Sequence, residues 1–188
     1  MNLTFCILTY NSAGTVKATV QRIMKQNIIP KIMIYDNGSV DGTVEMVQAW
    51  IKNRWFGQAE IELIIDNHLA GGTVRNIAHC RYMASQKIKT KYIMFVDSDV
   101  LLPPFIMARL VKDMEGDPKI GMIGIRYEPN AKHVKMGSTI IKTELAKVAV
   151  WRGHPKCECL HLKDELEDKG LVVKYHNEFQ ATHLRIFL

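Results

Sequence analysis

The first half of the chain alternates strand-length apolar runs with stretches that carry an apolar stripe at helical spacing. The runs predicted to be strands are Leu3–Thr9, Ile32–Tyr35, Ile61–Ile65 and Tyr92–Val96. Between the first two runs, Val16, Val20 and Ile23 recur every three or four residues, which indicates one buried helix face. Strands separated by helices predict an α/β fold with a mainly parallel sheet that helices cover on both faces.

The second half of the chain is less regular. Strands are expected over Ile120–Arg126, Gly137–Ile141 and Leu171–Tyr175, and helices over Lys142–Trp151 and Glu158–Lys169. Gly170 is expected in the left-handed conformation that ends a helix. In the first half, Asn11-Ser12 is expected to cap the first helix, and Ser39, Asp41 and Thr43 are expected to cap the second. Pro103-Pro104 is expected to begin the helix after the fourth strand.

A chain of 188 residues with 47% hydrophobic and 23% charged side chains is expected to form one globular domain. Its apolar runs are too short for a transmembrane helix, and the strand-like run at Leu3 leaves no room for a signal peptide, so we expect a cytoplasmic protein. The formal charge of +6 comes from scattered basic residues without interleaved aromatic residues. This predicts no nucleic-acid partner and leaves peripheral contact with an anionic membrane open.

The four cysteines are Cys6, Cys80, Cys157 and Cys159. The first two fall within predicted core elements. The Cys157-x-Cys159 spacing is too short for the usual zinc-binding pair, and no second pair accompanies it. We therefore expect reduced thiols with structural roles.

Two aspartates, Asp97 and Asp99, come directly after the fourth predicted strand. Side chains two positions apart on an extended segment point the same way, so both carboxylates converge where the strand ends. Such a pair suits a hard divalent cation, Mg²⁺ or Mn²⁺, which would also hold phosphate oxygens. The residues alone allow a second interpretation, a solvated turn in which Asp99 caps the next helix.

Other polar segments follow the other predicted strands. They are Thr9–Asn11 after the first strand, Asp36 after the second and Gly71-Gly72 after the third. Ligands of open α/β sheets bind beyond the carboxyl ends of the strands. We therefore expect these segments to meet Asp97 and Asp99 on one rim of the sheet.

The segments Thr9–Asn11, Tyr35–Thr43, Gly71–Asn76 and Phe95–Asp99 follow one another in an order and spacing that resembles the family 2 glycosyltransferases of GT-A fold. The resemblance covers residues 1–110 and is looser beyond them. It implies a single GT-A domain, a Rossmann-like arrangement with a mixed, mainly parallel sheet. It also implies a nucleoside-diphosphate sugar as donor and a divalent cation as cofactor, with residues 1–110 binding the donor and residues 111–188 the acceptor.

The resemblance assigns donor-binding roles to residues after the first two strands. Asp36 matches the carboxylate that hydrogen-bonds the nucleotide base, while Thr9, Tyr10 and Asn11 match the segment beside the base and ribose. The residues themselves leave other interpretations open. Asp36 also suits an Asx-turn with the glycine that follows Asn37, and Tyr10 also suits a core position.

The resemblance also assigns residues around the expected cation. Gly71 and Arg75 match donor-binding positions, with Arg75 near the nucleoside and the metal-site aspartates. Asp97 matches the aspartate that holds the ribose or the metal, and Asp99 the main metal ligand. His183 matches a histidine that binds the metal or diphosphate in many GT-A enzymes. By residue type alone, Arg75 could equally be a surface helix residue.

An inverting glycosyltransferase also needs a base that takes the proton of the acceptor hydroxyl. Family members carry a Glu-Asp pair about a dozen residues before a glycine that closes a helix, and the match to Gly170 falls on Glu158. Cys159 stands where the family has aspartate. Glu158 is therefore the expected base, and Asp164 and Glu165 are the next candidates.

The sequence thus predicts a metal-dependent, inverting glycosyltransferase whose acceptor is a glycan, a lipid-linked molecule or a protein. The loop of residues 128–133 is expected to close over the donor. One alternative is a nucleotide-sugar-binding module without catalysis, which Cys159 favours. Another is a sugar nucleotidyltransferase, although the segment Thr9–Gly14 lacks the glycine-rich, basic loop expected of that class.

Overall fold

The computed structural model describes residues 2–66, 74–126, 134–151 and 158–184, with only the backbone described for residues 74–76 and 177. The helices are α1 (Val16–Ile23), α2 (Thr43–Lys52), α3 (Val74–Lys87), α4 (Met107–Gly116), α5 (Thr143–Val148) and α6 (Glu158–Asp168). The strands are β1 (Leu3–Thr9), β2 (Lys31–Asp36), β3 (Glu60–Ile65), β4 (Tyr92–Asp97), β5 (Val100–Leu101), β6 (Ile120–Arg126), β7 (Ser138–Lys142), β8 (Val172–Gln180) and β9 (Thr182–His183).

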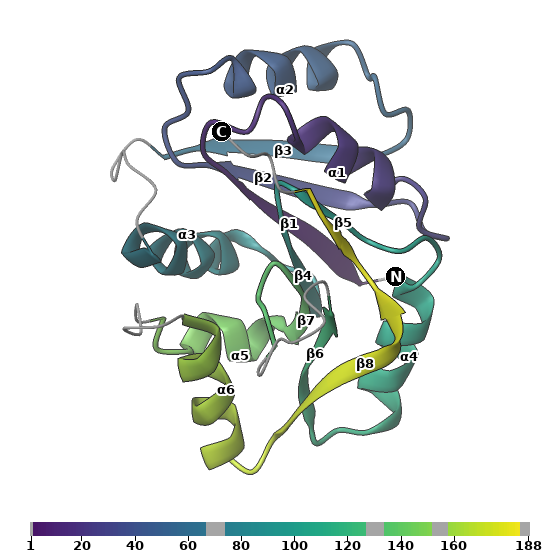
Figure 1. The fold of residues 1–188 in the computed structure, drawn as a ribbon, viewed down its shortest axis with the longest axis vertical. Helices are drawn as coiled ribbons and strands as arrows, with labels where there is room; N and C mark the ends of the chain where they lie inside the picture. The colour runs from purple at the N-terminus through teal and green to yellow at the C-terminus, as the bar shows by residue number, and fades with distance from the viewer. Residues whose placement is uncertain (1, 67–73, 127–133, 152–157, 185–188) are drawn as a thin grey trace.

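A seven-stranded sheet in the order β3-β2-β1-β4-β7-β6-β8 runs through the whole molecule (Figure 1). Strands β3, β2, β1 and β4 are parallel, β7 is antiparallel to both of its neighbours, and β8 is parallel to β6. The prediction of a mainly parallel sheet is confirmed. Because strands from both halves of the chain share this sheet, the described residues form one domain. Strands β5 and β9 make a separate antiparallel pair.

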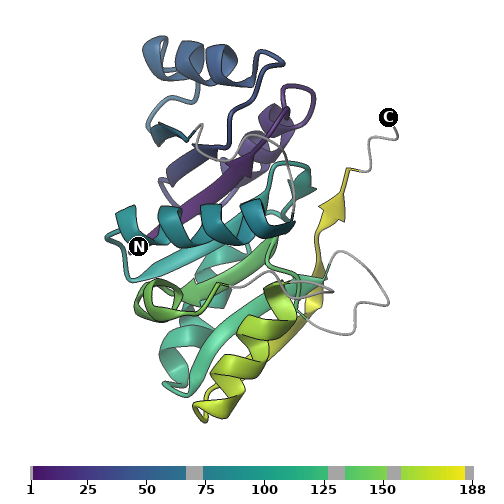
Figure 2. The same cartoon turned by 90° about the vertical axis from the view of Figure 1, so that its left-hand side faces the viewer.

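Two apolar layers cover the two faces of the sheet. Helices α1, α2 and α4 pack on one face through Val20, Trp50 and Leu110. Helices α3, α5 and α6 pack on the other, through side chains such as Ala84 and Leu162, and they face the viewer in Figure 2. Alternate residues of β1 enter the two layers, as expected for a strand buried on both sides.

The predicted core positions of two cysteines are confirmed. Cys6 and Cys80 are buried free thiols. Burial raises the pKa of Cys6 to about 12 and that of Cys80 to about 11, so both thiols stay protonated at neutral pH. Cys159 is also buried, and its Sγ accepts a hydrogen bond from the backbone N–H of Met136 at 3.3 Å. Cys157 lies outside the described residues.

The expectation that Pro103-Pro104 begin a helix is wrong, because α4 begins at Met107. Phe105 has a φ of 61°, a left-handed conformation that separates the prolines from the helix. The side-chain Oε1 of Gln26 accepts hydrogen bonds from the backbone N–H groups of Ile106 at 3.0 Å and Met107 at 3.3 Å. A residue from another part of the chain thus satisfies the start of α4, and local sequence gives no sign of it.

Three other predicted boundaries differ from the structure. The N-cap of α1 is Thr15, and not Asn11-Ser12. Helix α5 ends at Val148, before the expected end at Trp151. Strand β8 continues to Gln180 because it pairs with β6 along its length. Among the described helices, none has the length and apolar composition needed to cross a membrane.

Candidate active site

The carboxyl ends of β1, β2 and β4 lie together at one edge of the sheet. Thr9 is paired with Asp36 on one side of β1, and Leu8 with Asp97 on the other. A cavity of about 400 Å³ lies at this edge. The predicted site residues that line it are Thr9, Tyr10, Asp97, Asp99, Glu158 and His183. The expected convergence on one rim is therefore confirmed for Thr9, Tyr10, Asp97 and Asp99, whereas Asn11 and Asp36 do not line this cavity.

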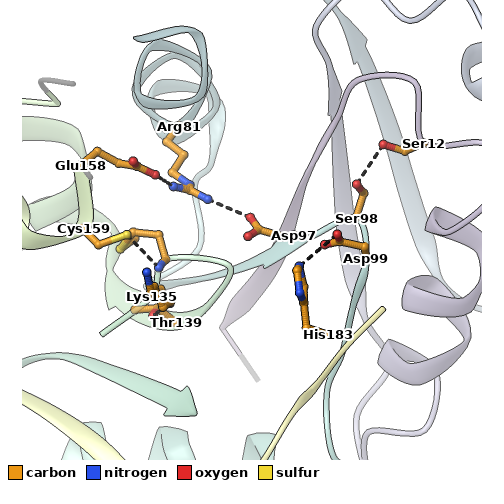
Figure 3. A network of polar contacts seen from close by, with 11 residues as sticks. Ser12, Arg81, Asp97, Ser98, Asp99, Lys135, Thr139, Glu158, Cys159 and His183 are labelled. Atoms are coloured by element: carbon orange, nitrogen blue, oxygen red, sulfur yellow. Dashed lines mark hydrogen bonds and ion pairs between the residues drawn. The ribbon is translucent and has the colours of Figure 1, made fainter. Parts of the chain in front are cut away.

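Asp99 and His183 form a pair within this cavity (Figure 3). His183 Nε2 lies 3.1 Å from Asp99 Oδ2. The pairing of β5 with β9 places His183 opposite Val100, and Leu184 N–H donates to the Asp99 carbonyl oxygen at 2.7 Å. The two side chains keep 33% and 28% of their surface exposed, so a ligand can reach both from solvent.

Arg81 of α3 contacts two of the acidic residues, as Figure 3 shows. Its Nη2 donates to Asp97 Oδ1 at 2.8 Å, and its Nη1 donates to Glu158 Oε1. Arg81 and Glu158 are buried, with 3% and 8% of their surface exposed. One guanidinium therefore joins the end of β4 to the start of α6.

Asp97 lies against backbone as well as against charge. Its N–H donates to the carbonyl oxygen of Gly137 at 2.9 Å, and a Cβ at Gly137 would lie 1.9 Å from Asp97 Oδ2. Loss of surrounding water raises the pKa of Asp97, and the charges of Asp99 and Glu158 add to this rise. The charges of Arg81 and His183 act in the opposite direction. Because an added Cβ at Gly137 would meet the Asp97 carboxylate, position 137 has no room for any larger residue.

Asp36 is fully buried and accepts hydrogen bonds on both carboxylate oxygens. Oδ2 accepts from the hydroxyl groups of Thr9 at 2.7 Å and Ser39 at 2.6 Å. Oδ1 accepts from the backbone N–H groups of Gly38 at 3.1 Å and Ser39 at 2.8 Å, which is the Asx-turn arrangement. The neighbouring Asn37 lines the cavity. The expected contact between Asp36 and a nucleotide base stays a prediction.

The loop after β1 supplies a cavity wall and a set of structural contacts. Tyr10 lines the cavity with 39% of its surface exposed. Asn11 has a φ of 49°, and its Oδ1 accepts from the N–H of Val40 at 2.9 Å. Ser12 Oγ lies 2.9 Å from Ser98 Oγ, which fixes this loop to the turn between the two aspartates. Asn11 thus joins two loops, and its expected role in donor binding stays a prediction.

The three candidate bases differ in their position relative to the cavity. Glu158 lines the cavity, whereas Asp164 and Glu165 do not. Asp164 is 57% exposed, and Glu165 accepts from the Val150 N–H at 2.9 Å and from Lys169 Nζ at 2.6 Å. These contacts give Glu165 a structural role at the packing of α6 against the segment after α5.

Several predicted residues lie outside what the structure describes. Gly71 and the loop of residues 128–133 fall outside the described ranges. Arg75 lies in α3, and its side chain is not described. Their expected roles therefore stay predictions.

The cavity suits a cation that binds together with a phosphate group. Within the described ranges, no cluster of three or more histidine, cysteine or acidic side chains could enclose a metal ion. Asp99 and His183 nevertheless supply one carboxylate and one imidazole side by side, with Asp97 two residues earlier. Mg²⁺ and similar cations take few protein ligands and complete their shell with water and substrate phosphates. The carboxylate and imidazole groups of this cavity fit this pattern of metal binding.

Two residues of the site did not emerge from the sequence, Arg81 and Gly137. A signal for Arg81 exists, because it shares the buried stripe of α3 with Ala78, Ala84 and Ser85. A charged residue on such a stripe is rarely buried without a partner. Gly137 carries no comparable signal, since its close approach to Asp97 depends on the tertiary fold.

The sequence profile of the family described as "Glycosyl transferase family 2" matches residues 4–161. A poly-beta-1,6-N-acetyl-D-glucosamine synthase from Staphylococcus epidermidis is 24% identical over 122 residues, which cover 64% of this chain and 27% of that protein. The chain thus spans about a quarter of the length of this relative.

Solved structures resemble the whole described fold. The mannosyltransferase PcManGT from Pyrobaculum calidifontis, in complex with GDP-Man and Mn²⁺, matches with a TM-score of 0.79 at 19% identity, over 97% of this chain and 56% of that one. S. aureus TarS 1-349 matches with a TM-score of 0.73 at 15% identity, over 97% and 60%. At these identities the likeness shows the fold, and the profile shows the family. The chain belongs to glycosyl transferase family 2 and has the GT-A fold.

Proposed function

We propose that this chain is a metal-dependent, inverting glycosyltransferase that moves a sugar from a nucleoside-diphosphate sugar to an acceptor hydroxyl group. The observation that carries the proposal is the meeting of Asp97, Asp99 and His183 with Thr9 and Tyr10 in one cavity. The membership of the family and the binding of GDP-Man and Mn²⁺ by PcManGT support it.

The lining of the cavity supports an orientation for the donor. Thr9, Tyr10 and Asn37 follow β1 and β2, and we assign the nucleoside to this end. Asp36 holds the nearby turn in place through its bonds to Thr9 and to the residues after Asn37. The diphosphate then faces Asp99 at the end of β4. Residues 1–110 accordingly bind the donor.

Asp99, His183 and Glu158 have distinct roles in the proposed reaction. A divalent cation held by Asp99 and His183 would neutralise the diphosphate leaving group, with Mn²⁺ or Mg²⁺ as the expected ion. The sugar passes through an oxocarbenium-like transition state while the acceptor oxygen attacks the face opposite the leaving group. Glu158, which opens α6 in the half assigned to the acceptor, takes the proton of that oxygen.

A nucleotide-sugar-binding module without catalysis is a second candidate. Its support is that Cys159 replaces the aspartate of the family, and that Arg81 engages the carboxylate of Glu158.

For the enzyme, the acceptor stays open between a glycan, a lipid-linked molecule and a protein. The cytoplasmic location and a peripheral contact with membranes also stay predictions, which cell fractionation would test.

Ligand-dependent melting and donor turnover test the proposal together. The wild type, Glu158→Gln and the control Asp164→Asn are heated with UDP, GDP, UDP-GlcNAc or GDP-Man, each with and without Mn²⁺. We expect one nucleotide class to raise the melting temperature of all three proteins, since a ligand that binds the folded state stabilises it by mass action. Release of nucleoside diphosphate from the matching sugar donor should fall by about 100-fold or more in Glu158→Gln alone.

The outcomes separate the candidates. Stabilisation by a nucleotide without any donor turnover in the wild type would favour the binding module. No stabilisation by any nucleotide would contradict both candidates.

A further inference from the structure

Arg81 is a buried cation between two carboxylates that come from different parts of the fold (Figure 3). Its side chain is only 4% exposed, and it donates to Asp97 at 2.8 Å and to Glu158. Bulk water and salt therefore screen the pair with Glu158 only weakly, whereas the Asp97 side chain keeps 35% of its surface exposed. The two carboxylates offset the cost of burying the Arg81 guanidinium, because a buried charge without a partner is strongly unfavourable.

The two ion pairs use different nitrogens of one planar group. Nη2 faces Asp97 and Nη1 faces Glu158, so the guanidinium sets the separation of the two carboxylates. The Cζ atom also lies 5.8 Å from the ring centre of Phe95 on β4, which restricts where the group can lie. A lysine ammonium is a single point charge and would not fix two partners in this way.

Glu158 lies where this link reaches α6. It is the first residue of α6, and Asp97 is the last residue of β4. Further along α6, Leu162 and Leu166 pack in the core. The first turn is joined to the rest of the molecule through Arg81, through the packing of Cys159 in the same core cluster, and through the bond from Met136 N–H to the sulfur of Cys159.

We propose that Arg81 is a positioning residue that sets the place of Glu158 relative to Asp97, and so aligns the acceptor side of the cavity with the donor side. Its effect on turnover rests on the proposed function, whereas its control of the first turn of α6 does not. Reacting groups must meet within narrow limits, and a misplacement of about 1 Å can cost about 100-fold in rate.

The modification rate of Cys159 reports on the first turn of α6 without any ligand. In a Cys157→Ser background, the two other cysteines are 0% and 2% exposed and should react slowly. We expect Arg81→Met to raise the rate at which N-ethylmaleimide modifies Cys159 by about tenfold, because that turn opens more often. Arg81→Lys should give a smaller rise. Peptide mass spectrometry identifies the modified residue.

Arg109→Met is the matched control. Arg109 is 53% exposed and pairs with Asp113 on its own helix, so its removal should leave the modification of Cys159 at the wild-type rate. Glu158→Gln provides a second test should Arg81→Met fail to fold, since it weakens the same link from the other side. It too should raise the modification rate.

Comparing the nucleotide affinity with the donor turnover of Arg81→Met tests the catalytic part of the inference. In Arg81→Met, the affinity for UDP or GDP with Mn²⁺ should change less than about fivefold, because Asp99 and His183 remain, while donor turnover falls about 100-fold. Arg81→Lys should recover part of the turnover.

Two results would overturn the inference. One is an unchanged modification rate of Cys159 in both Arg81→Met and Glu158→Gln. The other is an equal loss of nucleotide affinity and turnover in Arg81→Met, which would make Arg81 a donor-binding residue. Faster modification in a protein that binds no nucleotide would instead support the link to α6 and contradict the proposed function.

Discussion

Among single residues, Gly137 shows how closely the backbone approaches the carboxylate of Asp97. A Cβ at this position would lie 1.9 Å from Asp97 Oδ2, so Gly137→Ala must displace that carboxylate or the turn before β7. We expect a loss of about 1–3 kcal/mol in the free energy of unfolding, as for other overpacked sites. We also expect weaker Mn²⁺-dependent nucleotide binding. Urea unfolding and calorimetric titration measure the two effects.

Gly116→Ala is the control, since a Cβ there has no atom of the described structure within 4 Å. It should be neutral or slightly stabilising at the end of a helix. Equal stability of the two variants would show that Asp97 can move away from Gly137 without cost.

Asp36 is a second residue with a specific energetic expectation. Its carboxylate accepts from Thr9, Gly38 and Ser39, and none of its surface is exposed. Asp36→Ala leaves these donors without their acceptor, and we expect about 3 kcal/mol less stability in urea unfolding. The control Asp164→Ala, at an exposed position, should change stability by less than about 0.5 kcal/mol. A similar cost for both variants would contradict the structural role of Asp36.

Site residues that directly follow a strand could be predicted from the sequence. Site residues that meet only through tertiary packing could not. Asp97 and Asp99 stand out because the strand before them is strongly apolar, and His183 came from the family resemblance. Their convergence in one cavity agrees with the prediction. Arg81 contacts Glu158 across 77 positions of sequence, so its partner depends on where the tertiary fold places the start of α6.

Among the elements, the start of α2 shows how a carboxylate outside a helix stabilises it. The N-cap is Gly42, and Asp41 beside it accepts from the N–H groups of Thr43 at 3.1 Å and Ala13 at 2.9 Å. Partial burial acts to raise the pKa of Asp41. The hydrogen bond from the Thr43 hydroxyl, together with those from the N–H groups of Ala13 and Thr43, outweighs this effect and holds the pKa below its ordinary value. A lowered pKa means that the folded protein stabilises the ionised form of Asp41 more than the unfolded chain does.

This shift predicts a specific dependence of stability on pH. The stabilisation by Asp41 is complete above the unfolded pKa of about 4 and is lost as the pH falls through the lower folded pKa. Asp41→Asn should therefore be less stable than the wild type at about pH 6 and should lose less stability on acidification to about pH 3. Urea unfolding at both pH values measures the difference.

Asp168→Asn is the control for this experiment, because Asp168 is exposed at the end of α6. Its loss of stability on acidification should match that of the wild type. The account of Asp41 is contradicted when Asp41→Asn shows that same loss.

The end of α6 gives a test of backbone conformation alone. Gly170 has a φ of 74°, which confirms the predicted left-handed cap, and an added Cβ would have no described atom within 4 Å. Gly170→Ala should therefore cost about 1 kcal/mol through backbone strain. Gly170→Asn should cost less, since asparagine tolerates this conformation better than alanine. Equal costs in thermal unfolding would argue against backbone strain as the cause.

The elements of the first half follow from local pattern, and those of the second half follow less well. Helices α1 and α2 and strands β1 to β4 have periodicities that local sequence reveals. The start of α4 depends on the distant side chain of Gln26, and the length of β8 depends on its pairing with β6. Short β5 and β9 exist only because they pair with each other.

For the molecule as a whole, the sequence indicated the class of sheet but not its full order. Helix-linked parallel strands give β3-β2-β1-β4 naturally. The insertion of β7 between β4 and β6 has no local signal, and it brings Gly137 beside Asp97. The proposed acceptor half thus completes a cavity that the donor half begins. This arrangement explains why the proposed base Glu158 and its partner Arg81 come from separate elements.

The central claim is that the acidic strand ends gather around a cation that also binds a nucleoside diphosphate. Electron paramagnetic resonance of Mn²⁺ tests this directly, because bound and free ions give different signals. The wild type and the control Asp164→Asn should bind Mn²⁺ in the presence of UDP or GDP, and Asp99→Asn should weaken this binding by more than about tenfold through loss of a carboxylate ligand. Equal Mn²⁺ binding by all three proteins, or none that depends on a nucleotide, would contradict the account.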